Sequence, residues 1–331
     1  MSENVHDKKR LAELQALPLE RKILITQTRI IEWYTRWKGQ VYVSFSGGKD
    51  STVLLHIARQ CFPDIEAVFV NTGLEYPEIQ TFAKSFDNVT ILRPEMRFDE
   101  VLSHYGYPII SKSVANCIRL AKKGSPFRLK RMRGELTLNN GKKSWYNTDK
   151  YAPIMDCDFE VSELCCDVMK KKPTAVYEKQ TGKKPIIGTM AQESLLREKN
   201  WLAFGCNAFD GTRPKSAPMS FWTEQDVLNY IKKYNIPIAS VYGEVVGEAE
   251  SLCTTGCDRT GCIYCAFGAH RDKAQRFMQL KQTHPRQYEY CMGGGEHDEN
   301  GVWKPNKHGL GMAHVFDELN EIYGENFIRY K

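Results

Sequence analysis

The sequence predicts an α/β fold in which a parallel, twisted sheet is flanked by helices. Three observations support this prediction. Short apolar segments typical of buried strands alternate with segments of helical periodicity. A glycine-rich turn stands between the first strand segment and the helix after it. The chain has 331 residues, 42% of them hydrophobic, which is enough for one large domain or two domains with a sizeable core.

The predicted elements follow one another in a regular order. One helical face at 22–37 carries Ile23, Ile30, Trp33 and Trp37. The segments after it are expected as a strand at 41–45, a helix at 52–60, a strand at 66–71, a helix at 76–86, a strand at 88–94, a strand at 185–189 and a helix at 223–235 opened by Thr223. Strands separated by helices pair in parallel, so we expect one parallel sheet.

A basic segment from Lys112 to Lys150 interrupts this alternation. It contains eleven Lys or Arg residues against two acidic ones, and the sequence around Asn140 and Gly141 predicts a hairpin turn. We interpret it as an insertion into the sheet fold. Its basic side chains, with an aromatic among them, could follow a nucleic acid backbone, but a solvated surface or a lid over the phosphates of the nucleotide is slightly favoured. The residues in question are Lys122, Lys123, Phe127, Arg128, Lys130, Arg131 and Arg133.

Composition narrows the class of protein. No apolar signal region opens the sequence, and no stretch approaches the ~18 apolar residues of a membrane span, so we expect a cytoplasmic protein without membrane contact. The net charge of +6 is modest. Eleven cysteines, several closely spaced, favour metal or redox chemistry over disulfides. The oligomeric state stays open.

The most informative loop is SGGKDS, residues 46–51, which connects a strand to a helix. Backbone N–H groups and the positive helix end attract anions at such a turn. The P-loop pattern GxxxxGK followed by Ser or Thr does not occur in the sequence. The loop therefore predicts a phosphate site of another type.

SGGKDS resembles the PP-loop of the adenine nucleotide alpha hydrolase superfamily. NTGLEYPE (71–78), GTMAQESLLR (188–197) and the segment 217–242 are similar to segments of PAPS reductases. The resemblance implies that ATP or a sulfonucleotide binds here, with Mg²⁺ near Asp50. It assigns catalysis to Lys49, Asp50 and Arg197. It assigns nucleotide contacts to Ser44, Ser46, Gly47, Gly48, Lys49, Asp50, Ser51, Thr72, Gly73, Gly188 and Glu193.

The second motif combines a CC pair with the later sequence CTTGCDRTGCIYC. Assimilatory APS reductases are similar in pairing CC with a later GCxxC. The resemblance implies a [4Fe-4S] cluster, since soft thiolates suit iron–sulfur centres. Its ligands would be Cys165, Cys166, Cys262 and Cys265. Zinc is the alternative metal, and a ligand set that uses Cys253 or Cys257 stays open.

The sequence also departs from true sulfonucleotide reductases. Their terminal ECGxH motif is missing, and Cys291 in EYCMGGGEH is favoured as structural over nucleophilic. Met190 stands where reductases usually have Arg. The remaining cysteines, Cys61, Cys117, Cys157 and Cys206, are typical of small core side chains. The histidines at 270, 284, 297, 308 and 314 are typical of surface or loop positions, although a ligand or base among them stays open.

The resemblance predicts three consecutive segments: a helical segment at 1–39, a nucleotide-binding domain at 40–245 with the insertion at about 112–160, and a cysteine-rich region at 246–331. We expect an enzyme that acts at the alpha phosphate or its sulfo group, with a cluster for sulfur or redox chemistry. The alternatives are a thioredoxin-linked PAPS or APS reductase and a non-catalytic nucleotide-binding accessory of a defence or mobile-element system.

Overall fold

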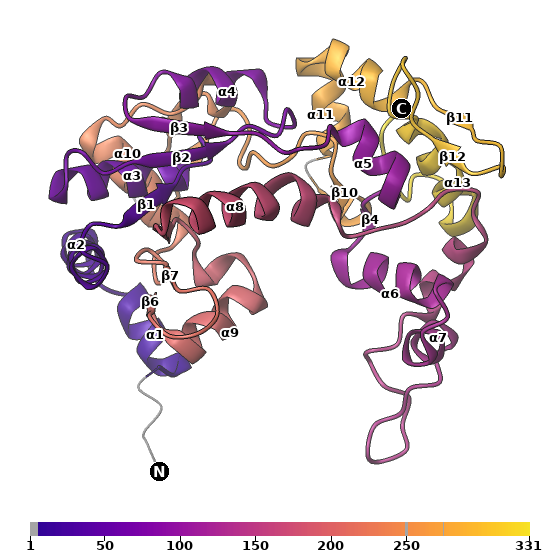
Figure 1. Cartoon of the computed structure of the whole chain (residues 1–331), viewed down its shortest axis with the longest axis horizontal. Coiled ribbons are helices and arrows are strands. Elements are labelled where there is room, and N and C mark those ends of the chain that lie inside the picture. The colour runs from indigo at the N-terminus through magenta and orange to yellow at the C-terminus, as the bar shows by residue number, and fades with distance from the viewer. Residues whose placement is uncertain (1–5, 249–250, 274) are drawn as a thin grey trace. The chain divides into compact units, whose positions relative to one another are not determined.

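The computed structural model describes residues 6–248, 251–273 and 275–331. Its six-stranded sheet has the order β3-β2-β1-β5-β7-β6 (Figure 1). The strands are β1 Val41–Ser44, β2 Ala67–Val70, β3 Val89–Leu92, β5 Lys184–Ile187, β6 Asn207–Ala208 and β7 Lys215–Ser216. Five of them pair in parallel, and β6 pairs antiparallel with β7 at the edge. The predicted parallel sheet is confirmed.

Helices cover both faces of this sheet. They are α1 Lys8–Gln15, α2 Leu19–Arg36, α3 Lys49–Cys61, α4 Pro77–Lys84, α8 Lys172–Thr181, α9 Leu195–Phe204 and α10 Glu224–Tyr234. Side chains alternate along β1, so Val41 and Val43 join the core around α2 and α3. Tyr42 points to the other face and packs edge-on against Tyr177 of α8 at 5.3 Å between ring centroids. Burial on both faces is typical of parallel strands.

The predicted element order agrees with the structure, and the boundaries differ by a few residues. Helix α3 begins at Lys49 rather than at 52, because Gly47 turns the chain with φ +70° and Gly48 is already the N-cap. Thr223 caps α10 as predicted, and together with Asp226 it forms a capping box. A short hairpin, β8 Val245–Val246 and β9 Cys253–Thr254, follows in the same part of the chain.

A second group of elements surrounds a smaller core. It comprises α5 Phe98–Tyr105, β4 Ile109–Ile110, α6 Lys112–Lys122, α7 Pro126–Arg133, β10 Ala266–Phe267, α11 Arg276–Thr283, α12 Pro285–Met292, β11 Glu296–His297, β12 Trp303–Lys304 and α13 Met312–Tyr323. Strands β4 and β10 pair in parallel and so join the segment just before the insertion to the C-terminal region. Ile109, Phe277 and Phe316 are buried within this group.

The chain divides into two compact units that are interleaved in sequence. One contains residues 1–71, 75–93 and 173–261, and the other contains residues 72–74, 94–172 and 262–331. These units cut across the three consecutive segments predicted above, whose boundaries stay a prediction. Within the described ranges, no helix is both long and apolar enough to cross a membrane.

The insertion contains the predicted turn. Leu138 N donates to Lys142 O at 2.8 Å, and Gly141 has φ +75°. Arg131 was expected among the exposed basic residues, but its side chain is 3% exposed. It donates to Tyr146 O at 2.7 Å and lies over the Tyr146 ring, so it supports the hairpin base instead.

Candidate functional site

The SGGKDS loop leaves the carboxyl end of β1 and opens α3. A Cβ at Gly47 would lie 2.9 Å from Ile79 Cγ2 of α4, so both the positive φ and the close packing require glycine there. Two serines brace the turn. Ser46 N donates to Ser51 Oγ at 3.1 Å, and the two hydroxyl oxygens are 3.0 Å apart. The loop is therefore held in one shape at the helix N-terminus, where anions bind favourably.

Lys49 is buried at this helix start, with 3% of its side chain exposed. Its Nζ donates to the Asp258 carbonyl oxygen at 2.8 Å and lies 3.1 Å from Glu224 Oε1. Its backbone N–H donates to Tyr242 Oη at 3.3 Å. Tyr242 in turn pairs with the Thr260 hydroxyl at 2.6 Å. The Glu224 carboxylate thus lies beside Lys49 in a position that would suit a phosphate oxygen equally well.

Asp50 has an unusual environment. Within the described part of the chain its Oδ1 is buried and without a hydrogen-bond partner, 3.9 Å from Lys49 Nζ. Burial raises the pKa of Asp50, although the charges of Lys49, Arg259 and Arg197 oppose that shift. A buried carboxylate oxygen without a donor is costly unless a proton or cation reaches it.

Two arginines lie near Asp50. Arg197 pairs with Glu193 one turn away, and Arg259 Nη2 is 3.8 Å from the same carboxylate. Burial and the Arg259 charge lower the pKa of Arg197. Together with Lys49, these side chains form a group of three cations around the loop. Such a group suits a ligand with several negative charges.

The other predicted nucleotide residues divide between the two units. Ser44 ends β1, and Gly188 packs against α3, since a Cβ there would meet Ser51 Cα at 3.4 Å. Glu193 accepts from Met190 N at 2.8 Å and holds both arginines, which makes it a positioning residue. Thr72 and Gly73 belong to the other unit, where Thr72 Oγ1 accepts from Leu74 N. Their nucleotide contacts stay a prediction.

Sequence reasoning missed several residues at the loop. They are Glu224, Asp258, Arg259 and Thr260. Arg259 and Thr260 stand inside the cysteine motif, which drew the interpretation toward metal binding. The sequence did contain a signal for Arg259, because a basic residue stands between two cysteines of this motif. Met190 is 2% exposed, so an arginine charge at that position would have been buried here.

In the second unit, the four predicted cysteines line one pocket. Cys165 and Cys166 precede a π-helix, Asp167–Lys171, and Cys262 and Cys265 form a turn. The rest of the lining is Leu74, Phe98, Pro108, Met169 and Lys170. Four thiols in a largely apolar pocket suit a thiolate-ligated metal or iron–sulfur group, and π-helices are often found at functional sites.

Electrostatics in this pocket favour thiolate at Cys166. A hydrogen bond from Cys165 and the nearby Lys112 ammonium hold the pKa of Cys166 below its ordinary value. The Cys165 thiol that makes this bond has a raised pKa. Burial alone would lower the pKa of Lys112, but the Cys166 charge raises it instead. A cation beside thiolates also moderates the negative charge of a ligated cluster.

The remaining cysteines occupy different environments. Cys253 is exposed and Cys257 is partly buried, and both belong to the unit that contains the SGGKDS loop. Cys291 is fully buried, and this burial raises the pKa of its thiol. A buried, protonated thiol is a poor nucleophile, which supports the structural interpretation of Cys291.

Comparison with known proteins identifies the family. The model of the phosphoadenosine phosphosulfate reductase domain matches residues 40–122 and 129–267, which is more than half of the chain. The chain belongs to this PAPS reductase domain family. The matched ranges include the SGGKDS loop and all four cysteines of the pocket.

Individual relatives of this PAPS reductase domain protein are distant. Adenosine 5'-phosphosulfate reductase of Staphylococcus haemolyticus is 24% identical over 77% of this chain and 83% of its own length. The uncharacterized protein MJ0973 of Methanocaldococcus jannaschii is 35% identical over 95 residues, and the chain spans only 23% of it. The solved PAPS reductase of Candida auris is 13% identical, covers 74% of this chain and 97% of its own, and has a TM-score of 0.39.

Proposed function

We propose that this protein binds ATP or a related adenine nucleotide at the SGGKDS loop and acts at the alpha phosphate or its sulfo group. The observation that carries the proposal is the group of three cations, Lys49, Arg197 and Arg259, gathered at a braced helix N-terminus. Adenine would lie at the carboxyl ends of β1 and β2, near Val43 and Val70, where open α/β sheets bind their ligands.

The chemistry follows from the charges. An oxygen or sulfur nucleophile attacks the alpha phosphorus, and the bond to the pyrophosphate oxygen breaks. Both electrons of that bond leave with pyrophosphate, so negative charge grows on its bridging oxygen. Lys49 and the N–H groups that open α3 would stabilise this charge. For this the Lys49 ammonium exchanges the Glu224 carboxylate for a phosphate oxygen.

Asp50 supplies the metal ligand of the proposal. Its unpartnered, buried Oδ1 is the kind of oxygen that Mg²⁺ prefers. A magnesium ion bound there with the nucleotide would neutralise phosphate charge. Arg197 and Arg259, kept in place by Glu193, would contact the oxygens of the reacting phosphate or sulfo group.

We further propose a [4Fe-4S] cluster held by Cys165, Cys166, Cys262 and Cys265. The shared pocket of these residues and the thiolate character of Cys166 support this ligand set. A cluster there would supply electron transfer or a sulfur-binding surface. Zinc is the alternative, since a set of four thiolates accepts it equally well.

Two other functions remain as alternatives. A thioredoxin-linked PAPS or APS reductase needs a nucleophilic thiol, and the burial of Cys291 disfavours that residue. A nucleotide-binding accessory without turnover would bind through the same loop and release no product.

The deciding experiment uses ATP labelled on its alpha and gamma phosphates, and separately PAPS or APS with reduced thioredoxin. Intact pyrophosphate together with AMP or an adenylated acceptor supports the proposal. Sulfite release supports the reductase. Nucleotide binding without either product supports the accessory. ADP with free phosphate as the only products would contradict the assignment of the loop.

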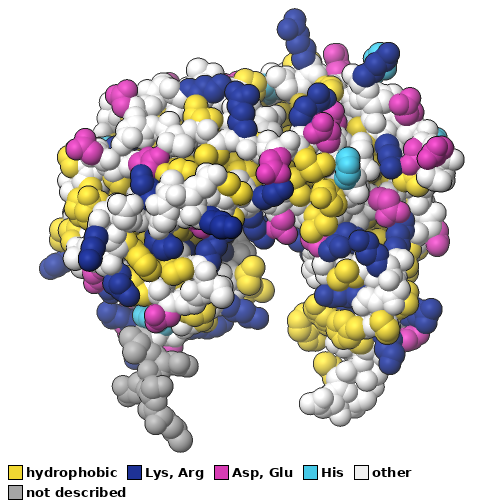
Figure 2. All heavy atoms as spheres, viewed as in Figure 1, with side chains coloured by type: hydrophobic (Ala, Val, Ile, Leu, Met, Phe, Trp, Pro, Cys, Tyr) yellow, Lys and Arg dark blue, Asp and Glu magenta, His cyan; other side chains and the backbone are white. Residues whose placement is uncertain are grey.

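A second surface is a candidate for nucleic acid. We define the basic hairpin patch as Lys123, Phe127, Arg128, Lys130, Arg133 and Trp145. Figure 2 shows hydrophobic and basic side chains side by side over α7 and the hairpin after it. Trp145 is 84% exposed and Phe127 is 51% exposed. Exposed aromatic rings among basic side chains are typical of surfaces on which bases stack, which favours a single strand of RNA or DNA over a plain solvated surface.

A further inference from the structure

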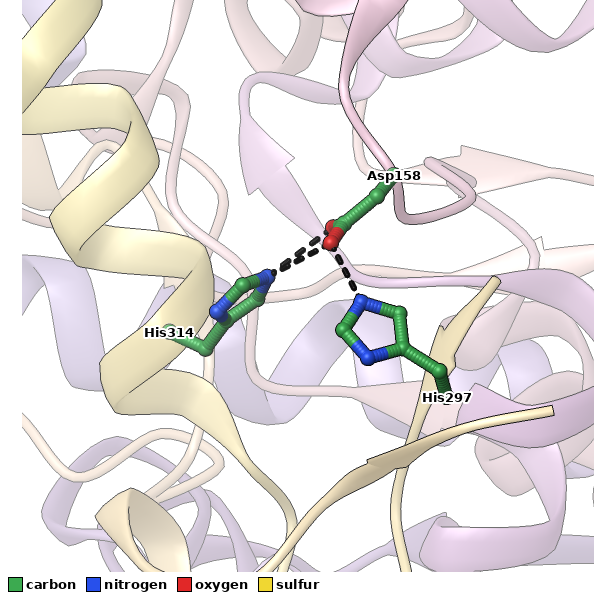
Figure 3. A group of neighbouring side chains, drawn as sticks. All are labelled: Asp158, His297 and His314. Carbon is green, nitrogen blue, oxygen red and sulfur yellow. Dashed lines mark hydrogen bonds and ion pairs between the residues drawn. The ribbon is translucent and has the colours of Figure 1, made fainter. Parts of the chain in front are cut away.

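Three polar side chains that belong to neither motif converge from distant parts of the sequence. Asp158 follows the 3₁₀-helix Asp149–Asp156, His297 ends β11, and His314 lies in the first turn of α13. Figure 3 shows both imidazole rings pointing at the Asp158 carboxylate. One ligand atom from each residue lies within 4.8 Å of the others. All three residues belong to the same compact unit.

The atoms that meet are those that bind metals. His297 Nε2 is 2.7 Å from Asp158 Oδ2, and His314 Nε2 is 2.9 Å from Oδ1 and 3.0 Å from Oδ2. Zinc takes imidazole nitrogen and carboxylate oxygen at about 2.0–2.2 Å, which places tetrahedral ligands about 3.3 Å apart. An outward shift of a few tenths of an ångström would therefore open the group around one ion.

Glu318 stands beside this group. It lies one turn after His314 on α13, and its Oε1 is 3.2 Å from His314 Nε2. The ligand atoms that lie mutually close are those of Asp158, His297 and His314. The Glu318 carboxylate adds negative charge next to them, which favours a cation in their midst.

The surroundings orient the two imidazoles before any ion arrives. The Trp303 ring stacks on His314 at 4.1 Å between centroids and meets His297 edge-on at 5.1 Å. Trp303 is fixed in turn, because its backbone N–H donates to Asp158 O at 2.7 Å and its Nε1 donates to Gly311 O at 3.0 Å. Ligand rings that are held by packing lose little entropy on binding, which raises the affinity of a site.

We propose that Asp158, His297 and His314 bind one zinc ion, separate from any metal at the cysteine pocket. Two nitrogen ligands and one oxygen ligand fill three tetrahedral positions and leave the fourth to a water molecule, as in zinc sites with three protein ligands. The ion ties β11 and α13 to the segment after Asp156. The His297 side chain is 48% exposed, so it leaves a path by which the ion enters from solvent.

The test uses the full chain and zinc alone as the probe. Zinc content after dialysis against limiting zinc is measured for the native protein, His297→Ala and the matched control His308→Ala, an exposed histidine of the same region. The native protein and the control should bind one more equivalent than His297→Ala, or bind it at least roughly tenfold more tightly. Equal zinc content and affinity in all three proteins would overturn the proposal, since the cysteines alone would then account for the metal.

Cobalt(II) provides a second readout that separates the two kinds of site. Cobalt bound by nitrogen and oxygen gives visible d–d bands without the strong near-ultraviolet sulfur charge-transfer band that cysteine ligands produce. The bands of nitrogen and oxygen ligation should survive in Cys262→Ser, and they should disappear when His297→Ala is added to that variant. Loss of every cobalt band in Cys262→Ser with a folded circular dichroism spectrum would contradict the site.

Discussion

The Lys49 ammonium lies 3.1 Å from Glu224 Oε1, so the lysine of the SGGKDS loop is paired with a carboxylate from the start of α10. The lysine side chain is 3% exposed and that of Glu224 is 38% exposed. A buried cation with a partly solvated partner can exchange that partner for a stronger anion. If the loop binds phosphate as proposed, Glu224 competes with that phosphate for Lys49.

Replacing Glu224 with Gln should strengthen nucleotide binding. The substitution removes the competing charge while the Asp258 carbonyl still orients the ammonium. A partly exposed ion pair contributes about 0.2–1 kcal/mol, so the dissociation constant for ATP or pyrophosphate should fall by about 1.5- to 5-fold in calorimetric titration. Glu13→Gln, which removes an exposed partner of Arg10 in α1, is the matched control. Weaker binding in Glu224→Gln would mean that the carboxylate positions Lys49 for the ligand.

Lys49→Ala should remove most of the catalysis. A preorganised cation beside developing charge contributes about 2–4 kcal/mol of transition-state stabilisation, so kcat for pyrophosphate release should fall by about 30- to 10³-fold. Lys84→Ala on α4 is the control, because Lys84 is an exposed lysine of the same unit. Retained turnover in Lys49→Ala would assign leaving-group stabilisation to another residue.

Asp50→Asn should stabilise the protein at neutral pH. The pKa of Asp50 is raised above its ordinary 3.8 because burial disfavours the charged carboxylate. The stability that its protonated form contributes is present below pH 3.8 and is lost as pH rises through the raised pKa. Near pH 7, Asp50→Asn should therefore have the larger free energy of unfolding, and the difference should narrow as pH falls toward 3.8.

Denaturant titrations at several pH values test this, with the exposed Asp64→Asn as the control. Magnesium adds a second comparison. If Asp50 binds Mg²⁺ with the nucleotide, the ion should increase the thermal stability of the nucleotide complex less in Asp50→Asn than in the native protein. A difference in unfolding free energy that is independent of pH would exclude the burial of charge as its cause.

The local sequence pattern correctly predicted the structural features that depend only on neighbouring residues. The alternation of strands and helices, the SGGKDS turn and the Thr223 cap are set within a few residues of sequence, and the structure contains each of them. Such short-range features are the most reliable content of a single sequence. The four predicted cysteines also share a pocket, but their two motifs are far apart in the sequence, and the family resemblance rather than local spacing predicted this grouping.

Contacts between residues that are distant in the sequence could not be predicted from it. Nothing near Lys49 indicates that Glu224 would reach it, and Asp158 with His297 carries no spacing that marks a ligand pair. Arg131 was expected on the surface because its neighbours are basic, although its side chain is buried under the hairpin. Each of these outcomes depends on tertiary contacts between distant segments, and single-sequence periodicity contains no information about them.

The cysteine pocket should contain iron. Protein purified without oxygen should be brown, with broad absorbance at roughly 400 nm, and Cys165→Ser or Cys262→Ser should bleach it. Cys61→Ser is the control. Cys253→Ser tests the alternative ligand set, because bleaching in that variant would assign Cys253 to the cluster. If the native protein contains no iron or sulfide, and contains zinc that Cys165→Ser lacks, then the pocket is a zinc site and the cluster proposal is wrong.

The basic hairpin patch should bind single-stranded nucleic acid, with Trp145 as its stacking residue. The indole side chain is 84% exposed, which leaves its face available to a base. Stacking on an aromatic ring contributes about 1–3 kcal/mol per base, so Trp145→Ala should weaken binding of a fluorescent oligonucleotide by about 5- to 150-fold.

Replacing Arg128, Lys130 and Arg133 together with Gln should reduce the slope of log affinity against log salt, because fewer counterions are released. Arg131 is left intact in this variant, since its guanidinium supports the hairpin base. Leu195→Ala, which removes a 75% exposed side chain from α9, is the matched control for lost apolar surface. If the native protein binds no oligonucleotide at low salt, or if Trp145→Ala and Leu195→Ala bind equally, the patch is a solvated surface and the proposal fails.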